Sequence, residues 1–355
     1  MAIHQILAGA APGDAVTNTA LDYQTLLRRV GPSRVYGCHI DPRLGEAVLP
    51  LSAFEAGGDP GDLIVYHLSI GEPAIVEFLL GRPERLVIVY HNVAPAEHYA
   101  VLDPRFAALL AGGRLEMEVL RGRTVLALAV SEYNAAELEA AGYADVRVCP
   151  LPVDIGALSA VEPDPDTMAE LKGLGGPLVL FVGQLLPHKR PDLLIQAYHV
   201  LTTYLRPEAH LVLLGTGRFE RYFRALTQLV AELNLHQAAL PGWLSLEELA
   251  AHYRNAAVFV TMSEHEGVCI PLLEAMSFDV PVLARRHAAI PETMGDAGLL
   301  LPPGDDPFLV AEALALLLTD EGVRSTLVDR GRRRLKTFDT EVAEQTFLSH
   351  LSTIF

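Results

Sequence analysis

Short, continuous apolar runs alternate with longer helical stretches along almost the whole of this 355-residue chain. Runs such as LIVYHL at 63–68 and LVLFV at 178–182 stay apolar instead of alternating with polar residues. This is typical of parallel strands that helices cover on both faces. The repeated order of strand and helix therefore predicts an α/β fold with doubly wound parallel sheets. The predicted strands are 3–8, 34–39, 63–68, 86–90, 126–130, 146–149, 178–182, 210–214, 257–262, 282–284 and 299–301.

The alternation breaks over residues 156–176, where VEPDPD at 161–166 is followed by several glycines. This composition predicts a linker. We expect it to join an N-terminal Rossmann-like domain (1–155) to a C-terminal one (177–338), with a last helix over 339–355 that is free to pack back on the first domain. Ligands of such sheets bind outside the carboxyl ends of the strands, so two facing domains would hold a ligand cleft between them.

Composition excludes several classes of function. The formal net charge is -17, so the chain lacks the basic footprint that non-specific nucleic-acid binding requires. Its three cysteines include no C-x-x-C pair, which excludes a disulfide scaffold and fits a reducing compartment. The first residues lack a positive n-region, and no window reaches the roughly 18 apolar residues of a membrane span. We therefore expect a cytoplasmic protein that binds no nucleic acid.

The segment SEHEGVCIPLLEAM at 263–276 carries the strongest functional signal. It follows a predicted strand, and Pro271 suits the first turn of a helix. Gly267 lets the backbone approach a ligand, and the amides after it lead into a helix N-terminus, where anions bind. Glu266 and Glu274 are placed to accept hydrogen bonds from hydroxyl groups. Two carboxylates beside an anion site favour a polyhydroxylated ligand over a bare phosphate.

These residues form the pattern E-G-x-x-x-P-x-L-E-A-M, which resembles the E-x7-E motif of retaining glycosyltransferases of family 4. The resemblance implies the GT-B fold of two facing α/β domains. It also implies transfer of a sugar, of the hexosyltransferase type, from a nucleoside-diphosphate sugar to an acceptor hydroxyl. In this family the second glutamate holds the nucleotide ribose and the first contacts the donor sugar, which implies these roles for Glu274 and Glu266.

The segment FVGQLLPHKRPDLLIQA at 181–197 resembles the opening of the family's second domain, usually G-R-x-x-x-x-K-G. Gly183 ends a predicted strand, and the resemblance implies that Lys189 meets the diphosphate as a point charge. The sequence departs from the pattern at Gln184, where arginine is usual, and at Arg190, where glycine is usual. Two options stay open: Arg190 replaces the missing cation, or Gln184 donates neutral hydrogen bonds to the diphosphate.

Further resemblances lie elsewhere in the chain. His91 ends a predicted strand where the family often has a histidine near the donor sugar. Gly13 and Asp14 stand in a loop before a helix that the family uses near the donor phosphates, although a plain turn explains them almost as well. Trp243 and Leu244 resemble a base-binding loop, but the tryptophan is as easily explained as core.

Taken together, the catalytic candidates are His91, Lys189 and Glu266, and the donor-binding candidates are Gly13, Asp14, Gly183, Gln184, Arg190, Trp243, Leu244, Gly267, Val268, Cys269, Ile270 and Glu274. No metal or other cofactor is expected. Asp164-Pro-Asp166 has a metal-binding form but lies in the predicted linker, and the pair His265 and Glu266 has too few ligands.

The partners expected are a nucleoside-diphosphate sugar and an acceptor left open among a glycan, a lipid-linked glycan and a small molecule. Arginines near 105–123 leave peripheral membrane contact open, but the glutamates among them favour a solvated face. Two rival functions also remain: a sugar-nucleotide epimerase or hydrolase of similar fold, and a non-catalytic nucleotide-sugar-binding protein.

Overall fold

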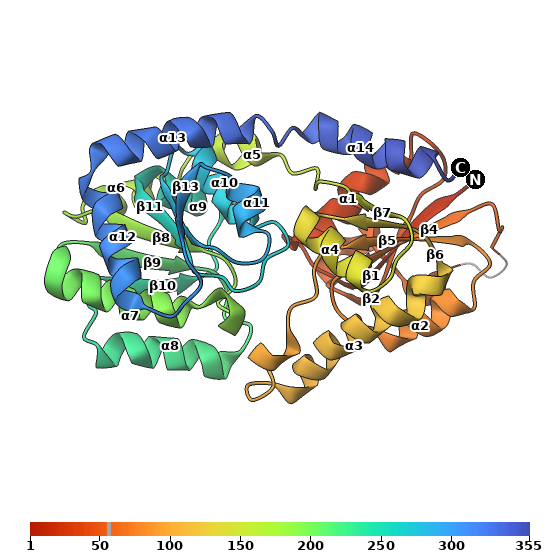
Figure 1. The fold of residues 1–355 in the computed structure, drawn as a ribbon, viewed down its shortest axis with the longest axis horizontal. Coiled ribbons are helices and arrows are strands. Elements are labelled where there is room, and N and C mark those ends of the chain that lie inside the picture. Colours follow the sequence, from red (N-terminus) through yellow and green to blue (C-terminus); the bar gives the residue numbers. More distant parts are fainter. Residues whose placement is uncertain (55–57) are drawn as a thin grey trace. The chain divides into compact units, whose positions relative to one another are not determined.

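The computed structural model describes residues 1–54 and 58–355, which form two compact units (Figure 1). Unit 1 comprises Met1–Val153 and Phe338–Phe355, and unit 2 comprises Asp154–Thr337. Each unit is an α/β structure built on its own parallel sheet. No helix of the described residues is both long enough and apolar enough to cross a membrane.

The described part of unit 1 contains a seven-stranded parallel sheet in the order β3-β2-β1-β4-β5-β6-β7. The strand order reverses between β1 and β4, which is where doubly wound sheets bind ligands. The strands are β1 (Ile3–Ala10), β2 (Val35–Ile40), β3 (Leu49–Pro50), β4 (Leu63–Leu68), β5 (Arg85–Tyr90), β6 (Thr124–Ala129) and β7 (Val146–Val148). The helices are α1 (Ala15–Leu27), α2 (Pro73–Leu80), α3 (Pro104–Leu120), α4 (Glu132–Ala140) and α14 (Thr340–Ser352), with shorter turns η1 (Pro42–Ala47), η2 (Leu51–Ala53), η3 (Ala96–His98) and η4 (Arg121–Arg123).

The central strands of unit 1 are buried because helices cover both faces of the sheet. All six residues of β4 are buried, as the continuous apolar run predicts. The sequence analysis missed β3, because an edge strand of two residues leaves no apolar run to recognise. Helix α3 begins at Pro104, where Asp103 accepts hydrogen bonds from the amides of Arg105 and Phe106.

The last helix, α14, is part of unit 1 although it follows unit 2 in the sequence. It lies along α1 (Figure 1), and the ring of Phe347 stacks on that of Tyr23 with centroids 3.6 Å apart. Both rings are fully buried, so this contact belongs to the core of the unit. Arg147 also donates to the hydroxyl of Thr353 at 2.8 Å, which ties the end of the chain to the sheet.

Residues 154–337 are all described and contain a six-stranded parallel sheet in the order β10-β9-β8-β11-β12-β13. The order reverses between β8 and β11. The strands are β8 (Leu178–Val182), β9 (His210–Leu214), β10 (Ala238–Gly242), β11 (Ala256–Thr261), β12 (Val282–Arg285) and β13 (Gly298–Leu301). The helices are α5 (Ile155–Ser159), α6 (Pro165–Lys172), α7 (Pro191–Val200), α8 (Glu220–Glu232), α9 (Leu246–Asn255), α10 (Ile270–Ser277), α11 (Ile290–Met294), α12 (Pro307–Thr319) and α13 (Glu321–Leu335), with the turn η5 (Pro187–Lys189) and the π-helical turn η6 (Leu201–Leu205).

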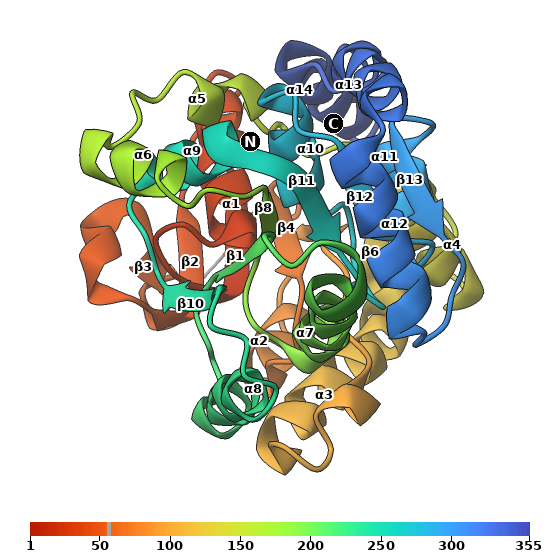
Figure 2. The same cartoon turned by 90° about the vertical axis from the view of Figure 1, so that its left-hand side faces the viewer.

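Helices α7 and α12 lie side by side against one face of the unit 2 sheet (Figures 1 and 2). Their apolar residues join those of β8, β9 and β11 in one core cluster that includes Phe181, Tyr198 and Leu314. Strand β10 escaped prediction because none of its residues is buried, so its sequence carries no continuous apolar run.

The segment predicted as a linker, residues 156–176, instead holds most of α5 and all of α6, and both belong to unit 2. The prolines and acids there start a helix: Asp164 accepts a hydrogen bond from the amide of Thr167 at 2.7 Å, and Pro165 takes the first helical position. The amide of Asp164 in turn donates to Glu247, which anchors the segment to α9. The boundary between the units therefore lies at 153/154 and again at 337/338.

Candidate functional site

The loops that follow β8, β9, β10 and β11 are tied together at the carboxyl edge of the unit 2 sheet. Leu185 donates its amide hydrogen to Thr216, Gly215 donates to Gly242, and Glu264 donates to His188 at 2.7 Å. Gly215 and Gly183 have φ angles of 145° and 150°, a region that favours glycine. A methyl group on Gly215 would come within 1.9 Å of the carbonyl oxygen of Gly183. These loops consequently form one closely packed platform.

Lys189 and Glu266, which are 77 residues apart in the chain, meet on this platform. The Nζ atom of Lys189 lies 2.7 Å from Oε1 of Glu266, and their side chains are only 17% and 11% exposed. Burial by itself lowers the pKa of Lys189, but the negative charge of Glu266 outweighs it, and the pKa stands above its usual value. The lysine is therefore a permanent cation, with one of its three N–H bonds directed at Glu266.

Glu274, in α10, is bound by a residue of α9. The buried Tyr253 donates its hydroxyl hydrogen to Oε2 of Glu274 at 2.9 Å. Burial raises the pKa of Glu274, and the hydrogen bond from Tyr253 opposes that shift. Tyr253 was missed by the sequence analysis; a tyrosine on a helix face carries no local sign that its hydroxyl supports a carboxylate 21 residues away.

The buried thiol of Cys269 is affected by the charges of Lys189, Glu266 and Glu274. Burial raises the pKa of Cys269; Glu266 and Glu274 raise it further by their charge, whereas Lys189 opposes them. The fold brings Lys189 into contact with Glu266. Glu266, Cys269 and Glu274 follow one another in the segment that leads from β11 into α10.

Cys269 also turns the chain into α10. Its φ and ψ angles of 69° and 63° are left-handed, an unusual conformation for a residue with a side chain. None of the described carbonyl groups or side chains accepts a hydrogen bond from the amides of residues 267–270. Gly267, Val268 and Ile270 are half-buried, so these N–H groups stand at the helix N-terminus with their hydrogen-bonding capacity unused.

Arg190 is paired with carboxylates of unit 2. Its guanidinium group contacts Glu264 and Asp305, both at 2.7 Å, and also pairs with Asp192. Arg285 binds the same two carboxylates, Glu264 and Asp305. Arg190 has a φ of 51°, which explains why glycine suits this position. Its charge is paired within the network that ties the strand-end loops together, and the expected contact of Arg190 with the donor stays a prediction.

Gln184 is exposed at the end of β8, directly after Gly183, so its amide is available to a ligand. Trp243 follows β10 and is 76% exposed, which rules out the alternative that it belongs to the core. Leu244 beside it is half-buried and precedes Ser245, which caps α9 in a capping box with Glu248. The loop therefore presents an apolar ring at the carboxyl edge of the sheet.

In unit 1, Gly13 and Asp14 lie between β1 and α1. Gly13 has a φ of 78°, and Asp14 caps the helix by accepting hydrogen bonds from the amide and hydroxyl groups of Thr17, both at 2.9 Å. Both hydrogen bonds go to Oδ2 of Asp14, which leaves Oδ1 unengaged among the described residues. The loop thus works as a structural turn, the alternative reading of its sequence, and keeps one carboxylate oxygen available.

His91 directly follows β5 and is held by buried residues that the sequence analysis missed. Its Nε2 atom lies 2.8 Å from Nδ1 of His67, whose Nε2 lies 2.8 Å from Oε1 of Gln5. Desolvation lowers the pKa of His91 to about 3, so the ring is neutral at physiological pH. Gln5 and His67 are polar residues inside apolar runs, and this interruption of the pattern is the signal that could have identified them.

Other candidates have structural roles. Three arginines near 105–123 bind within unit 1: Arg114 pairs with Glu137, Arg121 donates to Ala141, and Arg123 donates to Arg82.

Across residues 1–54 and 58–355, no group of three or more His, Cys, Asp or Glu side chains is arranged to hold a metal ion.

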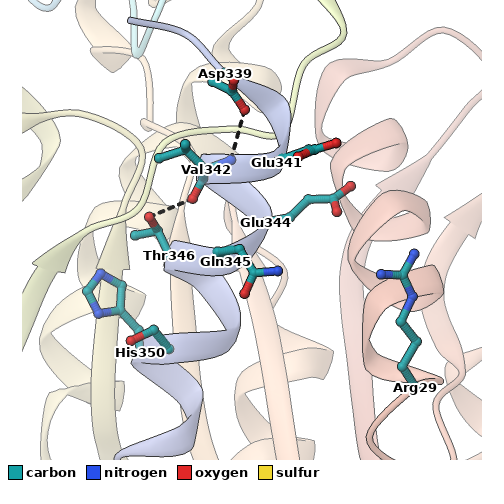
Figure 3. A pocket seen from close by; sticks show the side chains of 9 residues that line it. Arg29, Asp339, Glu341, Val342, Glu344, Gln345, Thr346 and His350 are labelled. Carbon is teal, nitrogen blue, oxygen red and sulfur yellow. Dashed lines mark hydrogen bonds between the residues drawn. The ribbon is translucent and has the colours of Figure 1, made fainter.

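A hollow of about 710 Å³ on unit 1 involves none of the predicted site residues (Figure 3). It is lined by Arg29, by Asp339 and by residues of α14 that include Glu341 and Glu344 (Figure 3). Arg29 follows the C-terminal end of α1, whereas Gly13 and Asp14 precede its N-terminal end. The hollow is therefore separated from the β1–α1 loop by the length of α1.

The sequence of unit 2 resembles that of a known protein family. The sequence profile described as "Glycosyl transferases group 1" matches residues 166–334, nearly all of this unit. Over these residues unit 2 is similar to the group 1 glycosyltransferases. O-antigen chain mannosyltransferase B of Escherichia coli is 34% identical to this chain over 168 residues, which are 46% of this chain and 42% of that protein.

A D-inositol 3-phosphate glycosyltransferase of Kineococcus radiotolerans is 29% identical over 275 residues, covering 71% of this chain and 62% of the relative. The chain thus matches less than two thirds of the length of either curated relative. The crystal structure of Anabaena HepE in complex with UDP and glucose covers 99% of this chain and 100% of its own, with a TM-score of 0.78 and 19% identity. This likeness confirms the predicted fold class, a GT-B chain with two Rossmann-like units.

Proposed function

We propose that this protein is a glycosyltransferase that moves a sugar from a nucleoside-diphosphate sugar to an acceptor hydroxyl with retention of anomeric configuration, and without a metal. The observation that carries the proposal is the ion pair of Lys189 and Glu266 at the strand-order reversal of unit 2, in the segment that leads into α10 with Glu274. Relatives described as a mannosyltransferase and a D-inositol 3-phosphate glycosyltransferase, and a neighbour solved with UDP and glucose, support a nucleotide-sugar donor.

Each group has a distinct part in the proposed reaction. Breaking the anomeric bond places negative charge on the departing diphosphate, and Lys189 with the unused amides of residues 267–270 is suited to stabilise that charge. Glu274 would hold the ribose, with Oε2 fixed by Tyr253 and Oε1 directed at a hydroxyl. Glu266, paired with Lys189, would orient the donor sugar without attacking it.

Further roles follow from exposure and position. The exposed ring of Trp243, beside Leu244, suits stacking on the base, and Gln184 suits a neutral hydrogen bond to the diphosphate in place of the usual arginine. In unit 1, His91 with Gly13 and Asp14 would serve the sugar and the acceptor. We propose a cytoplasmic setting, because Cys38, Cys149 and Cys269 are all free thiols.

Replacing Glu274 with glutamine tests the ribose contact. The amide is nearly the same size but is a weaker hydrogen-bond acceptor, so we expect affinity for the nucleotide sugar to fall by about tenfold. A thermal-shift screen with a panel of nucleotide sugars first identifies donors that stabilise the wild-type protein, and calorimetry then compares the variants. Glu312→Gln is the matched control, since Glu312 is exposed on α12. Equal donor affinity in Glu274→Gln and wild type would contradict the proposed contact between Glu274 and the ribose.

Removal of metal ions tests the proposed chemistry separately. Because an ammonium group and amide dipoles are proposed to stabilise the leaving diphosphate, EDTA should leave the rate of nucleoside-diphosphate release unchanged. The assay follows that release with and without an acceptor hydroxyl. Loss of activity that manganese restores would contradict the metal-free mechanism. Conversion of the donor sugar without any acceptor would instead indicate an epimerase or hydrolase.

A further inference from the structure

A line of hydrogen-bonded side chains crosses the interior of the unit 1 sheet. It begins at Gln5 on β1, passes through His67 on β4 and ends at His91, directly after β5. Gln5 and His67 have no exposed surface at all. Buried polar groups of this kind are costly unless each finds a partner, so the line must be satisfied throughout.

The hydrogen bonds have one direction only, which the Gln5 amide determines. Its Nε2 atom donates to the carbonyl oxygen of Ala20 at 2.8 Å, and a carbonyl oxygen can only accept. The Oε1 atom of Gln5 therefore faces His67, and Nε2 of His67 must carry a hydrogen in order to donate to it.

The direction of the hydrogen bond between His67 and His91 depends on the charge of His67. The ring is buried beside Tyr23, with centroids 6.1 Å apart, and the hydroxyl of Tyr23 is engaged with Cys149. No carboxylate in the described part of the chain pairs with His67. Desolvation lowers the pKa of His67 well below its usual value, and the nearby His91 lowers it further. His67 is consequently neutral, so its Nδ1 accepts a hydrogen bond from Nε2–H of His91.

We propose that Gln5 and His67 are positioning residues that hold His91 as the neutral Nε2–H tautomer, so that its Nδ1 accepts a hydrogen bond from a substrate hydroxyl. No described residue donates to Nδ1 of His91, so that lone pair is left for a ligand. A neutral acceptor repels a phosphate oxygen and recognises an O–H group. The identity of the ligand rests on the proposed function, whereas the tautomer does not.

The same line of residues does not act as a proton relay. A relay needs a group at its far end that can take up or pass on the proton, and here the line ends at a carboxamide bonded to the backbone of Ala20. Fixing a tautomer requires only that each donor has one acceptor, which the three distances of 2.8 Å satisfy.

The tautomer can be measured without any ligand. In the full-length protein with 15N-labelled histidine, His91→Gln assigns the His91 ring signals, and we expect Nε2 protonated and Nδ1 unprotonated at pH 7. His67→Asn and His67→Leu are a matched pair of similar size, of which only asparagine retains an acceptor for His91. We expect His67→Asn to preserve the tautomer and His67→Leu to shift His91 toward Nδ1–H. Wild-type His91 that is protonated at Nδ1, or at both nitrogens, overturns the proposal even if neither variant folds.

Binding separates this proposal from the proposed function. Calorimetry with UDP-glucose and UDP, and with GDP-mannose and GDP, compares each sugar with its parent diphosphate. His67→Leu should weaken binding of the sugar nucleotide about tenfold relative to the diphosphate, and His67→Asn should restore it. An equal loss for sugar nucleotide and diphosphate in His67→Leu overturns the assignment of Nδ1 to a substrate hydroxyl. If wild type binds none of these probes, the proposed function loses its support, while the ring spectra still decide the tautomer.

Discussion

Replacing Lys189 with methionine should weaken the binding of a nucleoside diphosphate by about a hundredfold, the largest loss of binding that we expect from one side chain of unit 2. Lys189 keeps two N–H bonds for phosphate oxygens after pairing with Glu266, and each charge-assisted hydrogen bond contributes about 1.5–3 kcal/mol. Methionine retains the length and apolar stem of the side chain, so the change removes mainly the charge. Isothermal calorimetry with UDP and GDP measures the effect.

The variant also leaves Glu266 with a buried, uncompensated charge, and breaking such a pair costs about 3–5 kcal/mol of stability. A second variant, Lys189→Met with Glu266→Gln, removes both charges and separates the two effects. It should regain most of the stability but not the affinity for the diphosphate. Lys172→Met, at an exposed position of α6, should change neither property. If the double variant bound the diphosphate as well as wild type does, Lys189 would have no role in donor binding.

A methyl group on Gly215 should disrupt the platform that carries Lys189. In Gly215→Ala the new Cβ would lie 1.9 Å from the oxygen and 2.6 Å from the carbon of the Gly183 carbonyl, which no side-chain rotation can relieve. The ends of β8 and β9 must separate, so we expect a loss of about 4 kcal/mol or more in the stability of unit 2. Gly183 precedes the loop that carries Lys189, so the affinity for UDP or GDP should fall together with the stability of unit 2.

Gly304→Ala provides a matched control for the backbone conformation. Gly304 has a φ of 150°, close to the 145° of Gly215, but a methyl group there would meet nothing within 4 Å. It should therefore show only the backbone strain, about 1–3 kcal/mol. Amide hydrogen exchange resolved by segment distinguishes the two, because Gly215→Ala should lower protection in β8 and β9. Equal loss of protection in both variants would mean that the close approach of Gly215 to Gly183 contributes nothing to the stability of unit 2.

Much of the fold could be predicted from local pattern. Buried parallel strands need apolar residues on both faces, so β4 and β8 appear in the sequence with the bounds that the structure has. Edge strands β3 and β10 are not buried in this way and escaped notice. The proline-rich segment around Asp164 was misread as a linker, because the same residues that interrupt a chain also cap and begin a helix.

The site could be predicted only in part. The spacing of Glu266 and Glu274 relative to a strand end and a helix start is a local property, and the predicted positions at that junction agree with the structure. The partners of the cations are not local. Arg190 was expected at the donor, but Glu264 and Asp305 reach it from loops 74 and 115 residues away. A resemblance at the position of Arg190 does not reveal which distant carboxylates will pair with its guanidinium group.

The sequence by itself determined which residues end strands and begin helices, and thus which side chains stand at the carboxyl edges of the two sheets. Periodicity, glycine positions and caps act over a few residues, so one stretch of chain contains the necessary information. Only the tertiary structure decided the pairing of Lys189 with Glu266, the support of Glu274 by Tyr253 and the line from Gln5 to His91. These contacts depend on strand order, which brings distant residues within hydrogen-bonding distance, and burial then makes each unpaired alternative costly.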